Sequence, residues 1–212
     1  MSTILSIGHS THTIERFIEL LRTHAVEVVA DVRSSPHSRL NPQFNRDDLK
    51  KSLKCAGIRY VFLGKELGAR SDDPSCYVGS KVQYELLATT KLFQEGLKRL
   101  IEGANSYRVA LMCAEKDPLH CHRTILVARE LLKHDIAVCH ILDSGELEQH
   151  SHAMARLMAE LKVSSQDMFR SEEDGINEAY AMQAKKIAYD RAAANGKGLE
   201  EDDTKQERGS IL

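Results

Sequence analysis

The densest group of reactive side chains lies in residues 113–123, which read CAEKDPLHCHR. Two cysteines, two histidines, charges of both signs and a proline directly follow the apolar run YRVALM at 107–112. Such a run is typical of a buried strand, so the reactive residues fall in the loop at its carboxyl end. Three chemistries use these residue types: metal binding, thiol catalysis, and acid–base work by a carboxylate with a histidine and an arginine.

The metal interpretation has suitable ligand types but an unusual spacing. Cys113, His120, Cys121 and His122 are all residue types that bind zinc, but the spacing C-x6-H-C-H lacks the usual C-x2-C or H-x3-H pairs. Adjacent residues also rarely point to one tetrahedral ion. We therefore predict no metal ligands and no cofactor, and keep a metal-dependent hydrolase as a further alternative for the function.

Thiol catalysis by Cys113, as in cysteine phosphatases or sulfurtransferases, meets a similar difficulty. The phosphatase pattern needs an arginine about six residues after the cysteine, whereas Arg123 comes ten residues after it. Glu115 and Asp117 would also repel a phosphate. The sequence favours Glu115 as base or nucleophile, His122 as proton carrier and Arg123 as anion-binding residue. The cysteines then pack in the interior, and a purely structural motif is the alternative.

Polar residues also follow the other apolar runs. After TILSI come Gly8, His9 and Ser10, a turn that could offer N–H groups to a phosphate, although His9 suits a hydrogen-bonded turn equally well. Asp31 and Arg33 lie at the end of VEVVADVR, one residue apart, and therefore point to the same face of a strand. A structural ion pair and a role in catalysis or binding are both open for them.

The loop RSSPHSRLNPQF, residues 33–44, is the main source of predicted anion ligands. Arg33 and Arg39 carry guanidinium groups, and Ser38 supplies a hydroxyl between them. This combination binds phosphate through charge and hydrogen bonds. We therefore include these residues, with Ser10 and Arg123, among the ligand-binding candidates.

The order of elements decides whether these residues meet. Apolar runs at 3–7, 26–32, 58–64, 107–113 and 136–142 predict strands, and segments of helical periodicity lie between them. This alternation predicts a three-layer α/β domain over residues 1–143, with a mainly parallel sheet of about five strands. Ligands bind outside the carboxyl ends of such strands, so we expect one shared pocket there.

The rest of the chain predicts helices and then a disordered tail. Residues 144–193 form a predicted helical extension in which Ala153, Leu157 and Leu161 make an apolar stripe. The stripe fits packing onto the chain's own domain, and it also fits a homo-oligomer or a docked partner. Residues 194–212 are polar, contain glycine and are predicted to be disordered.

Composition limits the class of protein. The 212 residues include 29 basic and 31 acidic ones, so the net charge of −2 argues against nucleic-acid binding by bulk charge. No apolar run reaches the roughly 20 residues that span a bilayer, and the N-terminal segment lacks a signal-peptide pattern. With five cysteines and no disulfide pattern, we expect a cytoplasmic protein with reduced thiols and no membrane contact.

Four segments in order resemble the bacterial and archaeal family called domain of unknown function 488: TILSIGHSTHTIERFIELL, VADVRSSPHSRLNPQFN, GIRYVFLGKELGAR and VALMCAEKDPLHCHRTILVAREL. The resemblance covers about residues 3–143, and Ala69 stands where the pattern has a second glycine. The family name implies no activity, but the resemblance implies that these motifs belong together. The matching residues are Gly8, His9, Ser10, Asp31, Arg33, Pro36, Ser38, Arg39, Pro42, Phe44, Leu67, Gly68, Cys113, Glu115, Cys121, His122 and Arg123.

We therefore predict a strand-end pocket that binds a phosphate-bearing ligand, either a nucleotide or a nucleic-acid end, and hydrolyses it. The catalytic candidates are Glu115, Asp31, His9 and His122, and the ligand-binding candidates are Ser10, Arg33, Ser38, Arg39 and Arg123. The first alternative is a ligand-binding or regulatory module without catalysis, in which the C-terminal helices dock a partner. The second is the metal-dependent hydrolase.

Overall fold

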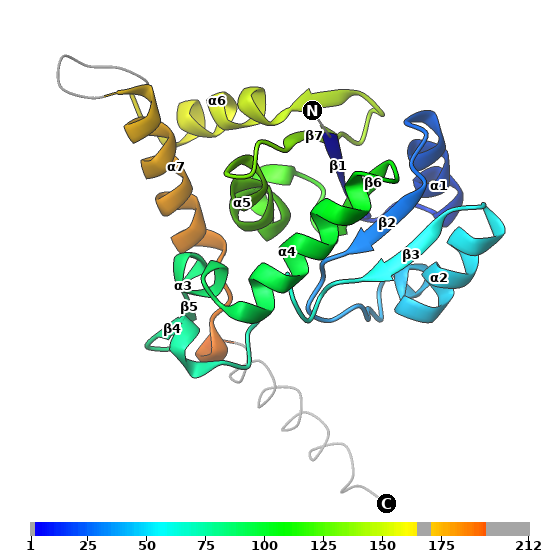
Figure 1. The fold of residues 1–212 in the computed structure, drawn as a ribbon, viewed down its shortest axis with the longest axis horizontal. Helices are drawn as coiled ribbons and strands as arrows, with labels where there is room; N and C mark the ends of the chain where they lie inside the picture. Colours follow the sequence, from blue (N-terminus) through cyan, green and yellow to red (C-terminus); the bar gives the residue numbers. More distant parts are fainter. Residues whose placement is uncertain (1–2, 165–170, 194–212) are drawn as a thin grey trace, which may run out of the picture.

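A six-stranded sheet forms the centre of the molecule in the computed structural model, which describes residues 3–164 and 171–193 (Figure 1). The strand order is β3-β2-β6-β1-β7-β8; the first five strands are parallel and β8 is an antiparallel edge strand. The three-layer α/β prediction is confirmed. The strands are β1 Thr3–Gly8, β2 Val28–Asp31, β3 Arg59–Phe62, β6 Val109–Cys113, β7 Ala137–Ile141 and β8 Leu147–Gln149.

Helices cover both faces of this sheet because its central strands are apolar on both sides. Every residue of β2 and β6 is buried. On one face, Leu5 and Ile7 pack with apolar residues of α1 and α2, and on the other, Ile4 and Leu111 pack with those of α4, η4, α5, α6 and α7. The α-helices are α1 Ile14–Thr23, α2 Arg46–Cys55, α3 Tyr84–Ala88, α4 Lys91–Ala104, α5 Arg129–Leu132, α6 His150–Leu161 and α7 Glu172–Ile187.

Short elements of other types shape the loops. Three are 3-10 turns that begin at a proline: η1 Pro42–Phe44, η2 Pro74–Cys76 and η3 Pro118–His120. A π-helix, η4 Arg123–Ala128, leads directly into α5. Such wide helical turns are rare and frequently occur at functional sites. Here η3 lies within the reactive motif after β6, and η4 begins at its last residue, Arg123.

Three segments contain elements that the coarse sequence prediction does not resolve. The stretch from residue 84 to 104 is two helices, because Thr90 interrupts the first and caps α4 by accepting a hydrogen bond from the Phe93 N–H. The beginning of the predicted extension, at Leu147–Gln149, is β8, which pairs with β7. The long connection after β3 contains a hairpin, β4 Tyr77–Val78 and β5 Lys81–Val82.

Helix α6 packs against β7 and β8, and α7 packs on α6, η3 and η4, so that the segment after α7 reaches the carboxyl end of the sheet. Ala153 and Leu157 of the predicted apolar stripe are buried in the core, so that part of the stripe is covered by the chain itself. After α7, the Val82 N–H donates to the Tyr189 carbonyl oxygen at 3.0 Å, which ties the segment to β5. Residues 194–212, predicted to be disordered, lie outside the described residues. No helix in the described ranges combines the length and apolar character needed to cross a membrane.

Candidate functional site

The carboxyl ends of β2, β6 and β1 lie side by side and bring together the three polar segments singled out in the sequence. Backbone hydrogen bonds continue the sheet beyond the strands: the His9 N–H donates to the Cys113 carbonyl at 2.9 Å and the Ser10 N–H to that of Ala114 at 2.9 Å. On the other side of β6, the Val32 N–H donates to the Met112 carbonyl at 3.1 Å. The turn after β1 and the loop after β2 therefore flank the reactive motif.

Asp31, Arg33 and His9 form a buried group, called here the Asp31 cluster. Arg33 Nε and Nη2 donate to the two Asp31 carboxylate oxygens at 2.9 and 2.7 Å, a bidentate pair. Nη2 also donates to the Phe44 carbonyl at 2.9 Å, and the Tyr60 hydroxyl donates to Asp31 Oδ2 at 2.7 Å. Asp31 is 0% exposed. Its carboxylate thus holds Arg33 and has no open side toward a cavity.

His9 completes the Asp31 cluster. Its Nδ1 donates to the Ser10 carbonyl at 2.9 Å, so Nε2 is left to accept from Arg33 Nη1 at 3.2 Å. The ring stacks on Phe44 with centroids 4.3 Å apart. Burial and the positive charge of Arg33 lower the pKa of His9 to about 4. His9 is therefore neutral at pH 7, with both ring nitrogens engaged.

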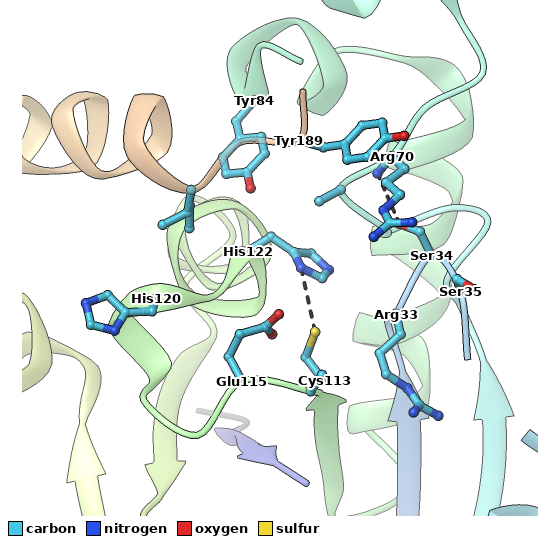
Figure 2. Close-up of a pocket in the computed structure, with 13 residues that line it drawn as sticks. Arg33, Ser34, Ser35, Arg70, Tyr84, Cys113, Glu115, His120, His122 and Tyr189 are labelled. Atoms are coloured by element: carbon cyan, nitrogen blue, oxygen red, sulfur yellow. Dashed lines mark hydrogen bonds between the residues drawn. The ribbon is translucent and has the colours of Figure 1, made fainter. Parts of the chain in front are cut away.

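A cavity of about 220 Å³ opens beside this cluster, at the end of β6 (Figure 2). Figure 2 shows the carboxylate of Glu115 directed toward Cys113 and His122, whereas the Arg33 guanidinium turns away from them. A second cavity of about 470 Å³ shares Arg33, Ser35, Ala114 and Glu115 with the first. The two spaces therefore adjoin along these residues.

Cys113, Cys121 and His122 form a second group, called here the Cys121 cluster. All three are buried, and their potential ligand atoms lie within 4.8 Å of one another. His122 Nδ1 is 3.7 Å from Cys113 Sγ and 3.9 Å from Cys121 Sγ. His122 Nε2 donates to the Val32 carbonyl at 3.0 Å, so Nδ1 is the nitrogen that faces the sulfurs.

The titratable groups of this cluster shift in opposite directions. Burial raises the pKa of the Cys113 thiol well above its ordinary value. Although burial opposes it, the hydrogen bond from Cys113 and the charge of Arg123 lower the pKa of Cys121. Burial and the negative charge of Cys121 raise the pKa of Glu115. Glu115 therefore holds a proton more readily than an ordinary glutamate, which suits a group that accepts one in a reaction.

Arg123 has a different place from the one predicted. It is 1% exposed, and Nη1 and Nη2 donate to the carbonyls of Glu115 and Lys116 at 2.7 and 3.2 Å. Its Nε has no hydrogen-bond partner within the described part of the chain. Arg123 lines neither cavity and instead fixes the backbone of the loop that carries Glu115.

The remaining ligand-binding candidates lie on the far side of the site. Ser10, at φ 46°, and Ser38 line the second cavity. The Ser38 hydroxyl accepts from the Asn41 N–H at 3.1 Å and helps to close the loop after β2. Arg39 is exposed and does not occur among the residues that line either cavity. The structure thus gathers Ser10, Ser38 and Arg33 around this space and leaves Arg39 outside it.

Sequence reasoning missed three residues of the first cavity: Arg70, Tyr84 and Tyr189. The exposed Arg70 guanidinium lies over the Tyr189 ring at 4.7 Å, and the Arg70 N–H donates to the Ser34 hydroxyl at 3.0 Å. Arg70 belongs to the long loop after β3, and the length of such a loop within a compact domain is a signal that could have indicated it. No comparable signal marked Tyr189, because it comes from the end of the C-terminal extension.

These features define the class as an open parallel-sheet α/β protein with a polar cavity at the carboxyl ends of its strands. The model of the family described as Domain of unknown function DUF488 matches residues 13–130, and the chain belongs to this family. The matched segment includes both clusters except for His9. A search of the curated proteins gave no match.

Proposed function

We propose that the two adjoining cavities bind a phosphate-bearing ligand, either a nucleotide or a nucleic-acid end, and that Glu115 promotes its hydrolysis. The observation that carries this proposal is the pairing of an exposed guanidinium, Arg70, with a carboxylate, Glu115, in the lining of one cavity. Guanidinium and hydroxyl donors suit phosphate oxygens, and Ser34 and Ser35 line the same cavity.

Each group then has a distinct role. Arg70 pairs with the phosphate, and the Tyr189 ring, over which its guanidinium lies at 4.7 Å, positions it in the cavity wall. Arg33 lines both cavities, but four of its five N–H groups are engaged, so it contributes at most one donor. Glu115 takes the proton of a water molecule whose oxygen attacks phosphorus, and the bond to the leaving oxygen breaks.

Calorimetric titration of the full chain tests the binding step. The probes are inorganic phosphate, a nucleoside 5′-monophosphate and a 5′-phosphorylated oligonucleotide. Arg70→Ala should weaken binding by roughly 10- to 100-fold, because a charge-assisted hydrogen bond contributes about 1.5–3 kcal/mol. Arg22→Ala is the matched control, since Arg22 is an exposed arginine on α1 that lines neither cavity. If the parent binds none of the probes, or Arg70→Ala binds them as the parent does, the proposal fails.

A non-catalytic binding module is the second candidate, and a specific observation favours it. Asp31 and His9, two of the four catalytic candidates, are fully engaged in hydrogen bonds within the Asp31 cluster. Release of inorganic phosphate from the probes separates the two candidates. Turnover by the parent that is lost in Glu115→Gln supports a hydrolase, whereas tight binding without turnover supports the module.

A further inference from the structure

We infer that the Cys121 cluster is a binding site for a thiophilic divalent cation of the Zn²⁺ type. Cys113 Sγ, Cys121 Sγ and His122 Nδ1 are its three protein ligands. Among the described residues, this is the one group of three histidine, cysteine or acidic side chains whose ligand atoms lie close enough to share an ion. The inference stands independently of the phosphate ligand proposed above.

The distances within the cluster are those of a coordination sphere. Zinc lies about 2.3 Å from a cysteine sulfur and about 2.0–2.1 Å from a histidine nitrogen, so a tetrahedral site separates sulfur and nitrogen by roughly 3.6 Å. The two observed separations are 3.7 and 3.9 Å. In the absence of an ion these contacts are long, weak hydrogen bonds, and each separation differs little from an edge of that tetrahedron.

The backbone explains how two adjacent residues point to one position. Cys121 has extended dihedrals, φ −133° and ψ 141°, whereas His122 has helical ones, φ −62° and ψ −23°. The change of direction between η3 and η4 turns both side chains toward Cys113. This junction is the feature that the spacing of the motif alone does not reveal.

The surroundings of His122 also match those of a metal-binding histidine. Such a histidine nearly always donates its other ring N–H to a carbonyl or carboxylate, which fixes the ring and its tautomer. Here Nε2 donates to the Val32 carbonyl at 3.0 Å, so Nδ1 is the nitrogen that would bind an ion, which displaces any proton held there. Because both cysteines are free thiols, binding also requires no disulfide to be broken.

The fourth position of such an ion faces the cavity. Cys113 and His122 both line it, and the Glu115 carboxylate is directed toward them (Figure 2). Zinc sites with three protein ligands and an open fourth position are of the catalytic kind, in which water or a substrate oxygen completes the coordination. This step deepens the proposed function, since Glu115 would then lie beside a metal-bound water molecule.

Metal analysis and cobalt spectroscopy test the site in the full chain. Protein purified without chelators and under a non-thiol reductant should contain one zinc ion per chain. Removing the metal and adding Co²⁺ should give thiolate-to-cobalt charge-transfer absorption. Cys113→Ser and Cys121→Ser should each weaken zinc binding by at least roughly 100-fold, because each removes one of three ligands. Cys76→Ser, at a buried cysteine outside the cluster, should leave binding unchanged.

A measurement on the parent alone covers the case in which a variant fails to fold. Bound zinc should slow alkylation of Cys113 and Cys121, but should not slow that of Cys55 or Cys139. The inference is overturned if cobalt gives no thiolate band in the parent, or if zinc protects neither cysteine of the cluster. The Arg70→Ala protein should keep the cobalt spectrum of the parent, so failure of the metal site and failure of the phosphate site are separate results.

Discussion

The Asp31 cluster and the Cys121 cluster lie at the ends of adjacent strands, yet they differ in how completely their polar atoms are paired. In the Asp31 cluster, both carboxylate oxygens and both nitrogens of His9 have partners at 3.2 Å or less. In the Cys121 cluster, His122 Nδ1 is no closer than 3.7 Å to either sulfur. Cys121 Sγ accepts from the Cys113 thiol and, at 3.4 Å, from the Arg123 N–H, and hydrogen bonds to sulfur are weak. The Asp31 cluster is thus a closed network of strong hydrogen bonds, whereas the Cys121 cluster is an open one, held by weaker contacts, whose sulfur and nitrogen atoms remain able to bind a ligand.

The largest predicted loss of stability comes from disrupting the Asp31 cluster. Asp31→Asn removes the negative charge opposite a guanidinium that is almost fully buried, and breaking a buried pair in this way costs about 3–5 kcal/mol. We expect the free energy of unfolding in urea to fall by about 3 kcal/mol or more. The control is Glu19→Gln, which removes the exposed partner of Arg16 and should cost less than about 1 kcal/mol. Equal small losses for both variants would show that the Asp31 cluster does not hold the fold.

Lowering the pH should reduce the stability of the folded protein because His9, in the Asp31 cluster, resists protonation. Its pKa in the folded protein is about 4, below the model-peptide value of 6.5, so only the unfolded chain takes up the proton as the pH falls between these values. Stability is therefore lost from about pH 6.5 to 4 and changes no further from this source below pH 4. The shift corresponds to roughly 3 kcal/mol.

Comparison with His9→Gln isolates this contribution. The variant should lose less stability than the parent between pH 6.5 and 4 when urea unfolding is followed at each pH. His140 and His150, whose pKa values burial lowers to about 2 and about 4, contribute a further loss in both proteins. Parallel pH curves for the parent and His9→Gln would contradict the prediction.

The sequence was sufficient to predict which segments meet. Hydrophobic periodicity and apolar runs indicate where the strands are, and the carboxyl ends of parallel strands lie at the same edge of the sheet. It did not predict which way each side chain points there. Arg123 is the last residue of the reactive motif, yet it turns inward to the carbonyls of Glu115 and Lys116. Cys121 and His122 were considered unsuited to one ion because they are adjacent, and the change of backbone conformation between them is a tertiary feature.

Long-range packing accounts for the residues that were missed. Tyr189 reaches the cavity because α7 packs across η3 and η4 and the following segment joins β5. No local pattern encodes that placement. Similarly, Leu147–Gln149 becomes a strand because the edge of β7 is available for pairing, although its composition favours a helix.

An intermediate effect is expected at Gly8, where the turn after β1 meets the loop that carries Glu115. A Cβ atom at this position would lie 1.9 Å from the Glu115 carbonyl oxygen, so the backbone must shift. Gly8→Ala should destabilise the protein by about 1–3 kcal/mol, as overpacking does. Gly103→Ala on α4 is the matched control, because nothing lies within 4 Å of its added methyl, and it should be neutral or slightly stabilising. Equal midpoints in urea for the two variants would rule out the close approach.

The smallest predicted effect on stability is at Glu115, beside the Cys121 cluster. Glu115 is exposed as a residue, but its carboxylate turns toward the buried Cys121 cluster (Figure 2). Desolvation there and the negative charge of Cys121 raise its pKa, so the folded protein gains little from its charge. Glu115→Gln should therefore change the free energy of unfolding by less than about 0.5 kcal/mol, while any phosphate release by the parent is abolished. A loss as large as that of Asp31→Asn would mean that Glu115 belongs to the closed network, and the distinction between the two clusters would no longer hold.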